Sequence, residues 1–241
     1  MLGGVLLAAA CVSVVLGTVL QAATGFGFSL VAAPLVFAAL EAEPAVGLLL
    51  ILGLEVNLLT LGTERRRPRP LMRAVTTMLI AAVPGALLGV VVLRALPEVA
   101  LQVAVTLGVL GTLIARQVKT AHLPAPVAGF AAGALTTSTS TNGPPMLLHL
   151  LGRGATPEQV RDTLTTAFIG LAAIGAIALA VTGTPALPDA ALVVALLPAV
   201  AVAHLAGRRV FARLAASEHY ERVLTAVMVV AVLVGLVGAL S

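Results

Sequence analysis

Charged residues are scarce in this sequence: they make up 10% of the chain, whereas 60% of the residues are apolar and the mean hydropathy is +1.12. That balance excludes an ordinary soluble domain, in which about a quarter of the residues are charged. The sequence therefore predicts an integral membrane protein, and every polar group must be judged against a lipid environment. The formal net charge of +4 does not indicate a nucleic-acid partner, because loop arginines orient membrane helices.

Cysteine, tryptophan and tyrosine are also nearly absent, with one, no and one copies respectively. A single cysteine excludes an intramolecular disulfide and a cysteine-rich metal site, and no spacing of His, Asp and Glu resembles a metal site. The lack of Trp and Tyr removes the usual aromatic belt at the membrane surface, so arginines must anchor the helices. We find no nucleotide-binding motif and expect no cofactor, so ATP cannot drive this chain directly.

Eight apolar runs remain when the sequence is cut at its charges. A spanning helix needs about 20 apolar residues, and six runs have the length of one span. The first run, 2–40, is too long for one crossing at 39 residues, and the fifth, 124–151, is interrupted by TSTSTNGPP. We expect both to form broken or re-entrant helical hairpins in an all-α membrane fold. The single spans are predicted at 45–63, 71–93, 99–115, 158–181, 189–207 and 221–240.

The positions of the basic residues decide between two topologies. If every run crosses the membrane once, the 14 Lys and Arg divide equally between the two sides, against the positive-inside bias. If both hairpins enter and return on one side, 13 of them face the cytoplasm and only Arg94 lies outside. We prefer the second topology, which puts both ends of the chain outside the cytoplasm.

Two inverted repeats, 1–118 and 119–241, follow from this topology, because each half then holds a hairpin and three crossings, an odd number. Three pairs of prolines recur at offsets of 111, 113 and 114 residues: Pro34 with Pro145, Pro44 with Pro157, and Pro84 with Pro198. The loops also exchange charge between the halves, since ERRRPRP corresponds to TGTPALPD, and RALPE corresponds to the basic GRRVFARLAASEHYER. Chance coincidence of prolines in an apolar chain is the alternative.

The interruption of the fifth run is the strongest candidate site. In hydrocarbon an irregular backbone is tolerated only where protein or a water-filled cavity satisfies its polar groups. Pro144 and Pro145 suit the first turn of a helix, so we expect a half-helix that begins there and runs to Leu151. Its N-terminal amides would form an anion site.

The donors expected around this break fall into two groups. The backbone donors are the amides of Asn142, Gly143, Met146 and Leu147, and the side-chain donors are Ser138, Thr139, Ser140, Thr141 and Asn142. Donors without a fixed positive charge favour release of a bound anion. The alternative is that these hydroxyls bond to carbonyls of their own helix and serve close helix packing.

A matching break is predicted in the first run, at ATGFGFSLVAAP. Gly25 and Gly27 permit an irregular backbone there, and Thr24 and Ser29 offer hydroxyls. Pro34 is expected at the start of the returning helix. Two such breaks that meet near the membrane midplane are the arrangement of inverted-repeat transporters.

Glu55 stands at the centre of VGLLLILGLEVNLLTLG, where a carboxylate costs about 2.5 to 3.5 kcal/mol on insertion scales. Two interpretations stay open: a proton-coupling carboxylate with Asn57 nearby, or a neutral side chain hydrogen-bonded between helices. Arg161 could draw anions to the cytoplasmic mouth, or could be a loop arginine that follows the positive-inside bias. His149 reads as a residue at a helix end.

Three stretches of the chain carry a family resemblance. They are TGFGFSLVAAPLVFAALEAEPAVGLLLILGLEVNLL, VPGALLG and GFAAGALTTSTSTNGPPMLLHLLGRGATPEQVRDT. Together they resemble the sulfite exporter TauE/SafE family, also described as the TSUP transporters, over nearly the whole chain. The resemblance implies a multi-pass protein of the prokaryotic inner membrane that transports sulfite or organosulfonates. Many relatives carry a Gly-rich, GPGTG-like break where this chain has TSTSTNGPP, so the identity of the substrate does not follow from the resemblance.

The sequence therefore predicts a secondary transporter of small anions, not an enzyme, that alternates access around two helix breaks, with Glu55 as the candidate for proton coupling. A passive anion channel is one alternative, and it would fail to concentrate its substrate. An intramembrane hydrolase with Ser138 or Ser140 as nucleophile and His149 as base is another, although no orienting acid or nucleophile-elbow motif supports it. The expected partners are a small anion, the lipid bilayer and a second copy of the chain, with no nucleic acid.

Overall fold

The computed structural model describes residues 2–64, 66–97, 99–101, 103, 123–214, 222, 226 and 229. Helices, turns and loops account for all of these residues, with no strand among them, so the predicted all-α membrane fold is confirmed. The helices are α1 (Leu2–Thr24), α2 (Phe28–Ala39), α3 (Ala42–Thr63), α4 (Met72–Ala95), α6 (Ala125–Ser138), α7 (Gly143–Leu151), α8 (Pro157–Val181) and α9 (Ala190–Leu214). The predicted helices at 99–115 and 221–240, and the repeat boundary after residue 118, lie almost wholly outside the described residues.

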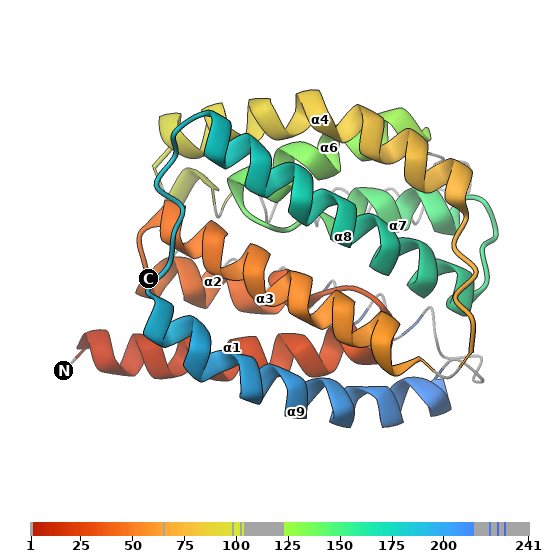
Figure 1. Ribbon diagram of the computed structural model, residues 1–241, viewed down its shortest axis with the longest axis horizontal. Coiled ribbons are helices and arrows are strands. Elements are labelled where there is room, and N and C mark those ends of the chain that lie inside the picture. The colour runs from red at the N-terminus through yellow and green to blue at the C-terminus, as the bar shows by residue number, and fades with distance from the viewer. Residues whose placement is uncertain are drawn as a thin grey trace.

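Five of these helices are long and apolar enough to cross a membrane, and they run across the view in Figure 1. The candidate spans are Gly4–Thr24, Ala42–Thr63, Met72–Ala95, Pro157–Val181 and Ala190–Arg209, each with a hydropathy of at least 2.0. The bounds of α3, α4 and α8 lie within about three residues of those predicted. Helix α9 continues to Leu214, well past the predicted end at 207, because Arg208 and Arg209 mark a membrane edge without disfavouring a helix.

Both predicted hairpins are present as broken helix pairs. In the first, α1 has 23 residues, the chain breaks at 25–27, and α2 returns with 12 residues. In the second, α6 has 14 residues, the chain breaks at 139–142, and α7 returns with nine. Pro144 and Pro145 occupy the first turn of α7, as expected for residues without an amide N–H.

Pro34 does not start the returning helix of the first hairpin, contrary to the prediction. Helix α2 begins at Phe28 and contains Pro34 in its interior. The positive backbone angles of Gly25 and Gly27, with φ of 89° and 106°, end the break before Pro34 is reached. A proline inside a membrane helix is tolerated where neighbouring groups satisfy the freed carbonyl.

The two hairpins connect to their following helices at opposite ends of the fold. Helix α2 ends just before α3 begins, and α7 ends just before α8 begins. Helices α3 and α8 are antiparallel, because Glu64 at the end of α3 pairs with Arg161 in the first turns of α8. Figure 1 accordingly shows α2 toward the left of the view and α7 toward the right. Arg153 and Arg66 lie at the α7 end, while Arg94 lies at the other end, with its Nη1 3.5 Å from the Thr182 carbonyl oxygen.

Two glycine pairs bring α4 and α6 together. Gly85 and Gly89 of the GALLG motif lie against backbone of α6, and Gly129 and Gly133 of the GFAAG motif lie against backbone of α4. A methyl group at any of these positions would collide with a backbone carbonyl of the partner helix. The two small-residue motifs are therefore complementary halves of one close contact, as small residues are in membrane helix packing.

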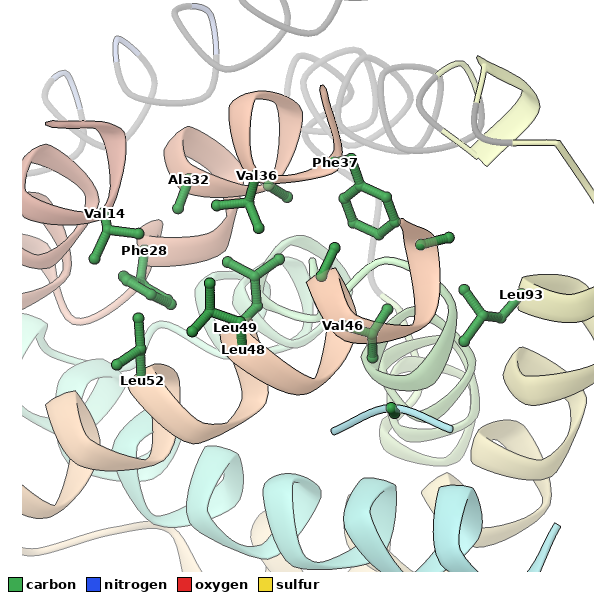
Figure 2. Packing of buried hydrophobic residues seen from close by; sticks show 14 of the residues in the cluster. Val14, Phe28, Ala32, Val36, Phe37, Val46, Leu48, Leu49, Leu52 and Leu93 are labelled. Carbon is green, nitrogen blue, oxygen red and sulfur yellow. The ribbon is translucent and has the colours of Figure 1, made fainter. Parts of the chain in front are cut away.

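Buried apolar side chains form two clusters, one around each hairpin. The first hairpin cluster, shown in Figure 2, places Val14 of α1 and Phe28 and Val36 of α2 beside Leu49 and Leu52 of α3. The second hairpin cluster joins side chains of α4, α6, α7 and α8, and it also takes in Phe26 and Leu30 from the first hairpin. The helix breaks lie where these two clusters adjoin.

Candidate functional site

A small cavity of about 30 Å³ lies between α1, α2, α3, α8 and the second helix break. Its polar lining residues come from four different segments: Gln21, Ser29, Asn57, Ser140 and Asn142. The remaining lining is apolar, with Phe28, Leu49 and Phe168 among its members. By this measure the cavity has room for about two water molecules. The second helix break and the helices that flank the first break thus supply polar groups to one cavity in an otherwise apolar core.

The two breaks also touch each other directly. A Cβ added to Gly143 would lie 3.2 Å from the Phe26 ring, so the start of α7 packs against the first break. Ser140 in the second break has a φ of 59°, a left-handed conformation that side chains other than glycine rarely adopt. Each break is therefore built on residues with positive φ, and the pair forms one contiguous irregular region.

A chain of amide hydrogen bonds lines one wall of the cavity. The backbone N–H of Phe28 donates to Gln21 Oε1 at 3.2 Å, and Gln21 Nε2 donates to Asn57 Oδ1 at 3.1 Å. Asn57 Nδ2 then donates to the Gly53 carbonyl at 2.6 Å. Gln21 thereby caps the first turn of α2 and ties α1 to α2 and α3. Gln21 was not among the site residues predicted from the sequence, although a polar amide inside the apolar first run carries the same signal as Glu55.

In the second break, Ser140 makes longer contacts with the protein than Asn142 does. Asn142 Nδ2 donates to Thr136 Oγ1 at 2.9 Å. The Ser140 hydroxyl lies 3.4 Å from the Thr136 carbonyl and 3.5 Å from the Val46 carbonyl, both long for a hydrogen bond between oxygens. Ser29 lines the same cavity from α2 and makes no hydrogen bond with the described residues. Ser29 and Ser140 can turn toward a ligand at small cost, whereas Asn142 would exchange its 2.9 Å hydrogen bond to Thr136 for one to the ligand.

Most other hydroxyls of the predicted site are engaged with backbone carbonyls. Ser138 donates to Ala134 and Thr139 to Leu135, as the helix-bonding alternative predicts. Thr141 shares a 2.8 Å hydrogen bond with Thr139. In the first break, Thr24 Oγ1 contacts the carbonyls of both Leu20 and Phe26. These residues shape the two breaks but do not line the cavity.

Gly25 and Gly27 also act through backbone shape, and Gly143 acts by close approach. Gly25 lies against Arg161, whose Cα would be 3.0 Å from an added Cβ. Among the site residues predicted from the sequence, the cavity therefore brings together Ser29, Asn57, Ser140 and Asn142.

Glu55 lies apart from this cavity. It is half-buried in a groove lined by Ile51, Leu58 and Leu197, and its Oε2 has no hydrogen-bond partner among the residues that the structure describes. Asn57, two residues on, faces the cavity instead, because two residues turn a helix by about 200°. Glu55 and Asn57 therefore face different surroundings and do not act as one pair.

An ion-pair cluster lies at the end of the fold at which α3 ends and α8 begins. Arg161, with a side chain only 3% exposed, donates to Glu64 at 2.9 Å. Asp162 accepts two hydrogen bonds of 2.8 Å from Arg66 and one of 2.7 Å from the Arg69 amide. These bonds to the carboxylate raise the pKa of Arg66 above its ordinary value. The loop that follows α3 is thus clamped on the start of α8, where Arg161 also contacts the first break.

The contacts of a catalytic nucleophile and its base are not those made by Ser138, Ser140 and His149. His149 Nδ1 lies 2.8 Å from the Leu123 carbonyl oxygen, at the opposite end of α7 from the break. The hydroxyls of both serines are directed to backbone carbonyls. His204 pairs with Thr63 at 3.1 Å. Within the described residues no group of three His, Cys, Asp or Glu side chains could hold a metal ion.

These features define a multi-pass membrane protein in which two broken helical hairpins meet around a polar, uncharged cavity. The model of the sulfite exporter TauE/SafE family matches residues 9–236, nearly the whole chain, and the chain belongs to that family. Membership makes it a membrane protein of a transporter family and confirms the resemblance seen in the sequence. No curated protein and no solved structure matches the chain.

Proposed function

We propose that this protein is a secondary transporter that moves a small sulfur oxyanion, sulfite or an organosulfonate, across the prokaryotic inner membrane. One observation carries the proposal: the second helix break and the helices that flank the first break contribute uncharged hydrogen-bonding side chains to the same cavity. Family membership supports transport of sulfur anions as the general activity. The cavity supports a ligand that hydrogen-bonds through oxygen, because amides and hydroxyls are its polar lining groups.

Neutral donors suit a substrate that must leave as readily as it enters. A fixed arginine in a dry cavity would bind an oxyanion with a strong, charge-assisted contact and would slow its release. Arg161 is the nearest candidate for such a charge, and it pairs with Glu64. The start of α7, which no side chain caps, adds partial positive charge from a helix terminus.

Alternating access around this cavity follows from the placement of the hairpins. The first hairpin leaves toward one end and the second toward the other, so rocking of one against the other opens the cavity to either side, as in inverted-repeat transporters. The ion-pair cluster of Glu64, Arg66, Arg161 and Asp162 closes one of these ends. The inverted duplication of 1–118 and 119–241 is part of this proposal.

Anion flux in proteoliposomes tests the site. Sulfite uptake by the wild-type protein is compared with that of a double variant, Ser140→Ala with Asn142→Leu. We expect the double variant to lose most of its flux, because both side chains line the cavity. Thr60→Val is the matched control, since Thr60 is buried in α3 but bonds only to the Val56 carbonyl in its own helix. Equal flux from the double variant and wild type would refute the site.

The coupling ion is tested with an imposed pH gradient. We propose that protons drive accumulation through Glu55, the half-buried carboxylate of α3. Gradient-driven accumulation of sulfite that is lost in Glu55→Gln would support this role. Flux that only dissipates gradients, in both proteins, would indicate a passive anion channel in place of a transporter. Accumulation that survives in Glu55→Gln would assign coupling elsewhere.

A further inference from the structure

We propose that Gln21 and Asn57, the amide pair, select the sign of the substrate's charge by presenting N–H groups to it. The inference rests on the proposed function, because the amide pair lines the same cavity, and it assigns the selection of an anion to two particular side chains. Both side chains are buried, with exposed fractions of 6% and 3%. Neither helix break contains them, so they are a separate contribution to recognition.

The direction of the hydrogen bonds in the amide pair is fixed from both ends. At one end the backbone amide of Phe28 can only donate, so the Gln21 group that faces it must be the oxygen. At the other end the Gly53 carbonyl can only accept, so the Asn57 group that faces it must be the nitrogen. The Gln21 nitrogen is then left to donate to the Asn57 oxygen between them. If either amide were flipped, a donor would face a donor at one contact and an acceptor would face an acceptor at the other.

The hydrogen-bonding capacity of the amide pair that still needs a partner is that of a donor, although each oxygen keeps a second lone pair. Both side-chain oxygens already accept a hydrogen bond, whereas each nitrogen has two N–H groups and uses one. A buried N–H without a partner is less tolerated than a carbonyl with a spare lone pair. The pair therefore needs a hydrogen-bond acceptor from the molecule that fills the cavity, and the oxygens of an oxyanion are such acceptors.

No charge in the lining competes with this selection. The twelve described residues that line the cavity are all uncharged. In such a space the orientation of amide dipoles decides which ion is stabilised, because there is no counter-ion to decide it. A cation would meet N–H groups at this wall and would be excluded.

Gln21→Glu separates selection from a purely structural role. A glutamate oxygen can still accept from the Phe28 amide, so the tether to α2 is kept. The second oxygen replaces the nitrogen, which removes the N–H offered to the substrate and also the hydrogen bond to Asn57 Oδ1. The lost bond to α3 lowers thermal stability, which is measured separately from affinity. We expect the dissociation constant for sulfite, measured by calorimetry on detergent-solubilised protein, to rise by about tenfold or more. If Gln21 only holds the helices, affinity should be unchanged.

Asn57→Asp removes the donor of the other member, together with its hydrogen bond to the Gly53 carbonyl, and carries the test if Gln21→Glu does not fold. Thr18→Val and Thr60→Val are the matched controls, because each removes a buried hydroxyl that bonds only within its own helix, close to one member of the pair. We expect both controls to bind sulfite within about twofold of wild type. Folding is checked by thermal unfolding and size-exclusion chromatography.

Each outcome decides between the hypotheses. Folded Gln21→Glu or Asn57→Asp protein with wild-type affinity would overturn the inference and leave the proposed function standing. Controls that lose as much affinity as the two variants would also overturn it. Failure of both variants to fold, with both controls folded, would show that the amide pair holds helices together and does not select the ligand. Wild-type protein that binds neither sulfite nor an organosulfonate would instead refute the proposed function.

Discussion

Ser140 is a residue at which backbone stability and ligand binding make opposite demands. Its left-handed conformation, with φ of 59°, costs a non-glycine residue about 1–2 kcal/mol. Its hydroxyl nevertheless lines the cavity and makes only long contacts with the protein. A residue under such strain with a loosely held polar group is typical of a functional site.

Ser140→Gly should therefore stabilise the protein and weaken ligand binding together. We expect the free energy of unfolding to rise by up to about 1 kcal/mol, because glycine adopts positive φ without strain. We expect the affinity for sulfite to fall several-fold, since one hydroxyl donor is lost. Ser140→Ala is the control, because it loses the hydroxyl and keeps the strain. Thermal unfolding and calorimetry measure the two effects, and a glycine variant no more stable than the alanine variant would contradict the explanation.

The sequence revealed some of the site's residues and not others for clear physical reasons. Ser29, Ser140 and Asn142 could be found because they stand beside glycines or prolines that break a helix. Their neighbours Ser138 and Thr139 have the same composition but bond to carbonyls one turn back, which depends on where α6 ends. Gln21 escaped notice because it lies inside a regular helix, and only the fold brings it to Phe28 and Asn57.

At the scale of the helices, the contact between α4 and α6 depends on glycine. Gly133→Ala places a methyl group against the Ala82 carbonyl, and helices held this closely have no space to move apart without loss of packing. We expect a destabilisation of about 1–3 kcal/mol, typical of overpacking. Gly62→Ala is the matched control, because nothing lies within 4 Å of a Cβ added there. Thermal unfolding in detergent compares the two, and equal stability would show that α4 and α6 separate freely.

The helices themselves were largely predictable, whereas their joints were less so. Hydropathy predicted α3, α4 and α8 to within about three residues, because the bilayer fixes how many apolar residues a span needs. The start of α2 was not predictable from Pro34, since the left-handed glycines before it decide where the helix begins. The end of α9 was missed because hydropathy reports a membrane boundary and not a helix boundary.

At the scale of the whole molecule, we propose that the ion-pair cluster holds one end closed. It joins the loop after α3 to the start of α8, and Arg161 within it contacts Gly25 of the first break. The contact joins the loop after α3, which follows the first hairpin, to the start of α8, which follows the second hairpin. An opening at this end must therefore separate these groups. Asp162, which accepts three hydrogen bonds, is the residue whose loss should loosen it most.

Asp162→Asn is expected to make the cavity more accessible from the arginine-rich face. The asparagine keeps one acceptor but loses the charge that pairs with Arg66, and a partly exposed pair of this kind contributes about 1 kcal/mol, or about fivefold in population. The probe is Ser29→Cys in a Cys11→Ser background, labelled with a membrane-impermeant maleimide from each face of the membrane. We expect the labelling rate to rise about fivefold from the arginine-rich face and to stay constant or fall from the other. Arg94→Gln is the control, since Arg94 lies at the opposite end. An unchanged rate, or one that rises equally from both faces, would show that the cluster anchors a loop and does not close the cavity.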